Sequence, residues 1–206
     1  MPQDLLPRAF QADLDRLYSR VIRPTLAELS LYPNIKHGEF TSQDEFLDNC
    51  QKQTSNLLAY EARRSFALTL SALFERQLRV WARVLFPKEE RIRDGSMKFE
   101  KLLTKAGNHR EIDLAAASAG ETIRELYFLA NVVRHGDGRS CNALWAHTRR
   151  YWEHMNEAAA EDCKQRAILS EFVQITDEDF VRYIRAATRF WGLADREFGA
   201  IVDGPY

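Results

Sequence analysis

The sequence predicts an all-α protein, a helical bundle built around one long central helix. Apolar residues recur at three- and four-residue spacing through most of the chain, which is typical of amphipathic helices. Two helix-start sequences, Ser42-Gln-Asp-Glu45 and Thr176-Asp-Glu-Asp179, precede the clearest of these stretches. A length of 206 residues without an internal repeat or a Pro/Gly/Ser-rich linker favours a single domain, residues 1–206.

The first half of the chain predicts two helices. Residues 8–29 form one amphipathic helix, packed on the bundle, and Pro24 is expected to kink its end. Residues 30–40 form a connection. The long central helix starts after Ser42 and runs to about residue 86, with a break near 52–56 as the alternative. Its apolar stripe, from Leu57 and Leu58 to Leu85, is expected to face the core.

The second half predicts shorter elements. A helix near 97–106 ends at Gly107, and another spans about 110–135 with an interruption near Gly120. Helix is expected again after Trp145, and residues 168–175 read as a short strand or an extended crossing. The last helix starts after Thr176. We expect the apolar stripes of 57–85, 121–133 and 180–191 to meet in one core.

Composition narrows the function classes. Twenty-nine Lys and Arg balance 30 Asp and Glu, which argues against a protein that coats nucleic acid but leaves a local basic patch open. The start of the chain lacks the pattern of a signal peptide, and no apolar run approaches 18 residues. The three cysteines, Cys50, Cys141 and Cys163, are expected to be reduced thiols in a cytoplasmic protein.

No cofactor or metal site is predicted. Cys141, His147, His154 and Cys163 are separated by six, seven and nine residues, which matches no standard zinc spacing. The sequence also lacks a glycine-rich phosphate loop.

The most informative stretch is Glu125 to Ser140, an apolar helix that ends in Arg-His and a glycine-flanked turn. At about 100° per residue, Arg124, Phe128, Asn131 and His135 project within roughly 60° of one another. Polar groups on a helix that is otherwise apolar need hydrogen-bond partners, either in the protein or in a ligand. They therefore form either a functional site or a polar network that joins helices or subunits.

This stretch carries a family resemblance. Together with the long helix containing Leu-Phe-Glu75 and the last helix with Phe-Val-Arg-Tyr and Phe-Trp, Asn131-Val-Val-Arg-His135-Gly-Asp-Gly resembles the HEPN superfamily (higher eukaryotes and prokaryotes nucleotide-binding). The resemblance covers roughly residues 56–195. It implies a helical bundle that pairs as a homodimer. Many HEPN proteins are metal-independent endoribonucleases in toxin–antitoxin and phage-defence systems, and others are non-catalytic.

The chain departs from the family at one position. The nuclease signature is Arg, four to six residues, then His, which places the arginine at 128, 129 or 130. Phe128, Leu129 and Ala130 stand there instead. A second pair, Arg149 and His154, has the signature spacing, but such a match is expected by chance in a chain with this many arginines.

Metal-free RNA cleavage needs an acid, a base and a cation on the phosphate. The candidate catalytic residues are His135 as acid or base, Arg134 or Arg124 on the phosphate, and Asn131 orienting the imidazole. Glu75 on the long helix is the supporting candidate. Arg139, Arg149 and Arg150, with aromatic neighbours, are the candidate RNA-binding residues.

Two functions follow as expectations. The first is a HEPN-like module, non-catalytic, that binds RNA, nucleotide or a protein partner such as an antitoxin in a defence or toxin–antitoxin context. The alternative is a metal-independent endoribonuclease that uses His135 with Arg134 or Arg124 across a dimer groove.

Overall fold

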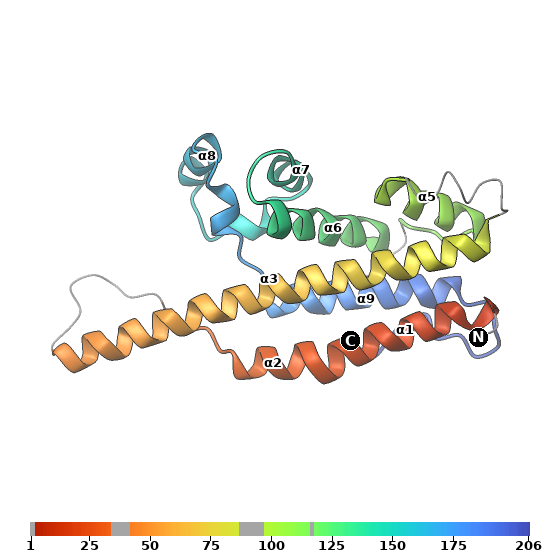
Figure 1. Cartoon of the computed structure of the whole chain (residues 1–206), viewed down its shortest axis with the longest axis horizontal. Helices are drawn as coiled ribbons and strands as arrows, with labels where there is room; N and C mark the ends of the chain where they lie inside the picture. The colour runs from red at the N-terminus through yellow and green to blue at the C-terminus, as the bar shows by residue number, and fades with distance from the viewer. Residues whose placement is uncertain (1–2, 34–41, 87–96, 116–117) are drawn as a thin grey trace.

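The computed structural model is an elongated all-α bundle (Figure 1) and describes residues 3–33, 42–86, 97–115 and 118–206. These ranges contain helices and no strand. The α-helices are α1 Leu6–Leu17, α2 Arg23–Glu28, α3 Gln43–Leu85, α5 Phe99–His109, α6 Ala119–His135, α7 Arg139–His147, α8 Glu157–Gln165 and α9 Asp177–Ala194. Short helical turns span Gln3–Leu5, Tyr18–Ile22, Arg150–Trp152 (η4) and Leu169–Phe172 (η5).

The long central helix is confirmed, and it is continuous through 52–56. The Ser42 hydroxyl accepts a hydrogen bond from the Glu45 N–H at 3.2 Å, as the predicted capping sequence requires. The helix then runs for 43 residues, about 65 Å at 1.5 Å per residue. It is longer than the bundle, so its first turns extend past the other helices (Figure 1).

The first amphipathic helix is also present, with a bulge in place of a simple kink. A π-helical turn, Tyr18–Ile22, joins α1 to α2, and the Arg23 N–H donates to the Tyr18 carbonyl five residues earlier. Pro24 follows immediately. Proline lacks an N–H and its ring crowds the carbonyl four residues before it, so the wider turn accommodates it.

Two predicted boundaries near α6 are wrong, and Leu114 packs against the glycine at each of them, Gly107 and Gly120. Helix α5 continues past Gly107 to His109, and α6 starts at Ala119 instead of near 110. Leu114 crosses between them: its Cβ and carbonyl oxygen both lie 2.8 Å from where a Cβ on Gly120 would stand. Gly120 therefore permits close packing of this crossing on the start of α6, and interrupts no helix.

The segment 168–175 is a crossing and not a strand. Leu169–Phe172 forms the η5 turn, and the residues after it are extended and mostly buried. The Gln174 N–H donates to the Tyr151 carbonyl at 3.1 Å. The helix expected after Trp145 is two helices: α7 begins earlier, at Arg139, and ends at His147, and α8 starts at Glu157, with η4 between them.

The three predicted stripes meet in one hydrophobic cluster, in which α3, α6 and α9 pack together and α1 covers α9. Its centre is aromatic: the Trp81 and Trp191 rings lie 5.3 Å apart and the Phe74 and Phe190 rings 5.4 Å apart. The prediction fails at one end of α3. Leu57 and Leu58 are 66% and 62% exposed, so they lie outside the hydrophobic cluster.

None of the helices in the described ranges combines the length and apolar character needed to cross a membrane.

Candidate functional site: an arginine-lined pocket beside a buried polar network

The predicted catalytic residues lie along the outer side of α6. Arg134 and His135 are exposed at its C-terminal end, and Asn131 is half-buried one turn earlier. Within the described ranges the side chains of these three residues form no hydrogen bond, ion pair or ring contact. Arg124 is half-buried about 16 Å further back along the helix, where its Nη2 lies 3.5 Å from the Thr104 hydroxyl of α5. A single copy of the chain therefore keeps Arg124 away from His135.

The glycine-flanked turn after α6 connects the α6–α7 junction to η5 through Asp137. Gly136 and Gly138 both have positive φ, 69° and 103°, which glycine adopts without strain. Between them, the Asp137 carboxylate accepts hydrogen bonds from the Ser170 N–H at 3.1 Å and the Ser170 hydroxyl at 2.5 Å. Burial, together with the nearby Asp137 charge, raises the pKa of the Cys141 thiol to about 12. The turn thus ties the α6–α7 junction to η5.

Glu75, the predicted supporting carboxylate, pairs along its own helix. Its Oε1 lies 2.7 Å from Arg79 Nη2 and 2.9 Å from Arg79 Nε. No contact in the described part of the chain joins it to the candidate residues of α6.

The predicted RNA-binding arginines fall into different environments. Arg139 is exposed at the start of α7. Arg149 is exposed, pairs with Glu157 at 2.8 Å and lies over the Trp145 ring at 4.8 Å. Arg150 instead turns inward and pairs with the buried Asp179 carboxylate at 2.8 Å. They do not converge on one surface.

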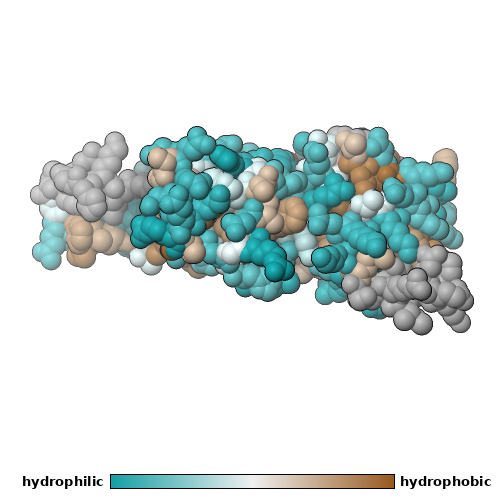
Figure 2. Space-filling model, turned by 90° about the horizontal axis from the view of Figure 1, so that it is seen from above, coloured by the Kyte–Doolittle hydropathy of each residue, from teal (hydrophilic) through white to brown (hydrophobic). Residues whose placement is uncertain are grey.

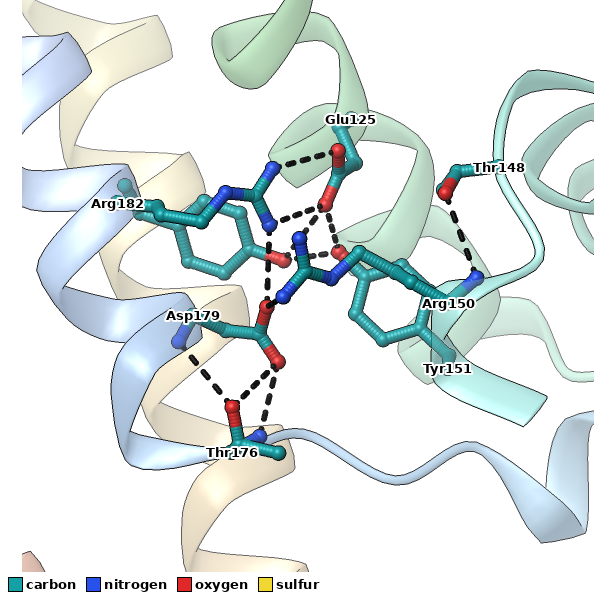
Figure 3. A network of polar contacts seen from close by, with 8 residues as sticks. Glu125, Thr148, Arg150, Tyr151, Thr176, Asp179 and Arg182 are labelled. Carbon is teal, nitrogen blue, oxygen red and sulfur yellow. Dashed lines mark hydrogen bonds and ion pairs between the residues drawn. The ribbon is translucent and has the colours of Figure 1, made fainter. Parts of the chain in front are cut away.

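A buried polar network of residues other than the predicted ones is centred on Glu125 (Figure 3). Glu125 is 6% exposed, and Arg182 of α9 binds its carboxylate with both terminal nitrogens, at 2.8 and 3.1 Å. The Tyr151 hydroxyl donates to the same carboxylate and contacts the Tyr183 hydroxyl. Burial raises the pKa of both tyrosines, so both hydroxyls stay protonated and can donate.

Asp179 continues the network at the start of α9. Its carboxylate accepts from the Thr176 N–H at 2.9 Å, which completes a reciprocal capping box, and it also binds Arg182 at 3.1 Å. With Arg150, these contacts tie α6, η4 and α9 to one another. The charges are satisfied, so the network positions Arg182.

A pocket of about 620 Å³ opens beside this network, between α6, the end of α7 and α9. Three arginines at helical spacing, Arg182, Arg185 and Arg189, form its α9 wall. The remaining lining residues are Ser118, Glu121, Thr122, Glu125, His147, Thr148 and Ala186. Arg182 is paired with Glu125 and Arg189 with Asp203, so Arg185 is the arginine of this wall that has no side-chain carboxylate partner in the described ranges. It lines the pocket together with His147 and the carboxylate of Glu121.

Two of these arginines also hold the segment after α9. Arg185 Nε donates to the Tyr206 main-chain oxygen at 3.0 Å, and Arg189 pairs with Asp203. The Arg189 Nε is buried and has no partner within the described ranges.

The arginine wall of this pocket has a signal in the sequence, the spacing of its arginines, although these residues are absent from the predicted site. Arg182, Arg185 and Arg189 repeat at three and four residues along the final helix, opposite its apolar face. Their significance depends on the wall that α6 and α7 supply, which no local pattern specifies.

Within the described ranges no three His, Cys, Asp or Glu side chains are grouped so that they could hold a metal ion. Comparisons with protein-family models, with curated proteins and with solved structures found no match for this chain.

Proposed function

We propose that this chain is a HEPN-like module that binds a phosphate-bearing ligand, RNA or a nucleotide, in the pocket between α6 and α9. The observation that carries the proposal is the row of three arginines in one cavity. Arginine binds phosphate through planar, bidentate hydrogen bonds and keeps its charge at every physiological pH.

The shape of the row supports a ligand with more than one charged group. Arg182 and Arg189 are seven residues apart on α9, about 10 Å along the helix axis. Arg182 is held rigid by Glu125 and Asp179, while Arg185 is exposed. The hydroxyls of Ser118 and Thr148 add uncharged donors on the facing side.

Titration of a labelled single-stranded RNA, followed by fluorescence anisotropy with ATP as a competitor, tests this proposal. Arg185→Glu should weaken binding at least about tenfold, because it replaces an attraction by a repulsion in the pocket. Arg139→Glu is the matched control: it makes the same charge change on an exposed arginine outside the pocket. Equal losses for the two variants, or no binding by the unmodified chain, would overturn the proposal.

A second candidate is the metal-independent endoribonuclease. It is favoured by the exposure of both Arg134 and His135 at the end of α6, where each side chain is open to a substrate or to a second copy. In this proposal a homodimer supplies the remaining groups across a groove, as the HEPN resemblance implies. His135→Ala should then abolish cleavage without lowering stability, and chelators should have no effect.

The HEPN resemblance is the basis for a further proposal, that the protein acts in a defence or toxin–antitoxin setting with a protein partner such as an antitoxin. A pull-down with RNA-free, nuclease-treated protein, followed by identification of bound proteins, separates a protein partner from a nucleic acid one.

A further inference from the structure

The return segment, residues 195–206, follows α9 and folds back between α9 and α1. In Figure 1 the chain turns after α9, and the C mark lies next to α1. Two side chains of α1 hold the segment by its main chain. Gln11 donates to the Ile201 carbonyl at 2.7 Å, and Arg8 donates to the Phe198 carbonyl at 3.1 Å.

A glycine lets the return segment lie directly on α9. A Cβ on Gly192 would stand 2.8 Å from the Val202 Cα and closer still to the Ile201 carbonyl oxygen, so a larger residue would push the segment away. Further along, the Tyr206 ring packs edge-on against the Tyr18 ring, with the centroids 5.4 Å apart. The segment is therefore fixed to the bundle at both ends.

Between these two contacts the return segment binds two arginines of the pocket wall. Arg185 donates to the Tyr206 main-chain oxygen from Nε, at 3.0 Å, and also from Nη2. Arg189 pairs with the Asp203 carboxylate. Adjacent guanidinium nitrogens are the donors with which arginine binds a phosphate in bidentate fashion. The segment thus offers both arginines the kind of oxygen that a phosphate would offer.

A ligand in the pocket reaches these arginines from another side. The described residues that line the pocket belong to α6, α7, α9 and their ends, and none belongs to the return segment. Over α6 and α7 the surface is mainly hydrophilic (Figure 2), which suits the entry of a charged ligand. The ligand and the return segment therefore share the guanidinium groups without sharing the cavity.

We propose that the return segment is a built-in competitor for the arginine row. While it is docked, Arg185 and Arg189 are held in contacts that a phosphate-bearing ligand has to break. This inference rests on the proposed function, since it assigns a regulator to the same pocket. The apparent affinity falls by the fraction of molecules whose arginines are released. Fixing the segment in place should weaken binding, and loosening it should tighten binding.

A disulfide that fixes the return segment tests the first expectation. A Cβ on Gly204 would stand 3.6 Å from the Thr188 hydroxyl oxygen, so cysteines at these two positions can form a disulfide. The oxidised double variant Thr188→Cys, Gly204→Cys should bind labelled single-stranded RNA at least about tenfold more weakly than the wild type, and reduction should restore the affinity. The wild type, oxidised and reduced in the same way, is the control, and mass spectrometry verifies the disulfide.

A variant with a loosened segment tests the second expectation. Gln11→Ala removes the hydrogen bond to the Ile201 carbonyl and a second one to the Thr188 carbonyl, so it should tighten RNA binding roughly three- to tenfold. Gln53→Ala is the matched control. It removes a similar hydrogen bond, 2.9 Å long, to the Pro33 carbonyl, away from the pocket, and should leave the affinity unchanged.

The inference and the proposed function fail in different ways. Suppose that the wild type binds RNA and that Arg185→Glu weakens this binding more than Arg139→Glu does. Equal affinities of the oxidised and reduced double variant, or of Gln11→Ala and Gln53→Ala, would then overturn the competition while leaving the phosphate pocket in place. A wild type that binds neither RNA nor ATP would overturn the proposed function and the competition with it.

Discussion

Glu125→Ala is the change that most directly tests the network joining α6 to α9. It removes the carboxylate that accepts two guanidinium hydrogen bonds and the Tyr151 hydroxyl. Breaking a buried ion pair from one side costs about 3–5 kcal/mol. Because the Arg182 side chain is 30% exposed and keeps Asp179 as a partner, we expect the lower end, about 3 kcal/mol.

Urea unfolding followed by circular dichroism measures this loss, and thermal unfolding should show a fall of about 6–12 °C, at 2–4 °C per kcal/mol for a chain of this size. Glu125→Gln keeps an acceptor for Tyr151 and should lose only about 1–2 kcal/mol. The matched control is Glu121→Ala, an exposed residue one turn earlier on α6, which should stay within about 0.5 kcal/mol of the wild type. An alanine variant at 125 as stable as that control would refute the reasoning.

Three further predictions follow from the site and its surroundings. Asp203→Asn should tighten RNA or ATP binding, because it releases Arg189 from its ion pair, and an unchanged or weaker affinity in anisotropy titrations would contradict this. The Cys141 thiol, with a pKa of about 12, should resist iodoacetamide at pH 8–9 while Cys50 reacts, as peptide mass mapping would show. The raised pKa of Cys141 stabilises the fold fully below the unfolded thiol pKa of about 8.5, and this stabilisation is lost as the pH rises from there toward 12. If the wild type cuts RNA, a gel assay of His147→Ala and His135→Ala decides where the cleavage site lies. Cleavage that needs His135 but not His147 places the site at the end of α6, and cleavage that needs His147 but not His135 places it in the arginine-lined pocket.

The helices that could be predicted from the sequence are those with a strong local signal. Ser42 and Thr176 mark two helix starts because their side chains accept hydrogen bonds from backbone N–H groups three residues later. Both partners of each bond lie within four consecutive residues, so the sequence alone reveals them. The start of α6 was misplaced because Leu114 and Gly120 fix it through a tertiary crossing. Leu57 and Leu58 belong to the predicted apolar stripe but are exposed, because the spacing of apolar residues does not specify which part of a long helix the bundle covers.

The candidate site was harder to predict, for a similar reason. Helical periodicity groups Arg124, Asn131 and His135 on one side of α6, where Arg124 and Asn131 are half-buried and His135 is exposed. The buried polar residue of this stretch is Glu125. Its partners, Arg182 and Tyr151, come from segments 57 and 26 residues away. Side-chain convergence over such separations depends on how the helices pack, which helical periodicity alone does not specify.

The salt dependence of RNA binding tests the central claim, that the arginines of α9 contact phosphate. Each phosphate contact contributes about one to the slope of log K against log salt concentration. Arg185→Gln should therefore lower that slope by about one relative to the wild type, while Arg134→Gln should leave it unchanged. An unchanged slope for Arg185→Gln, together with a reduced slope for Arg134→Gln, would contradict the account and move the phosphate contact to the end of α6.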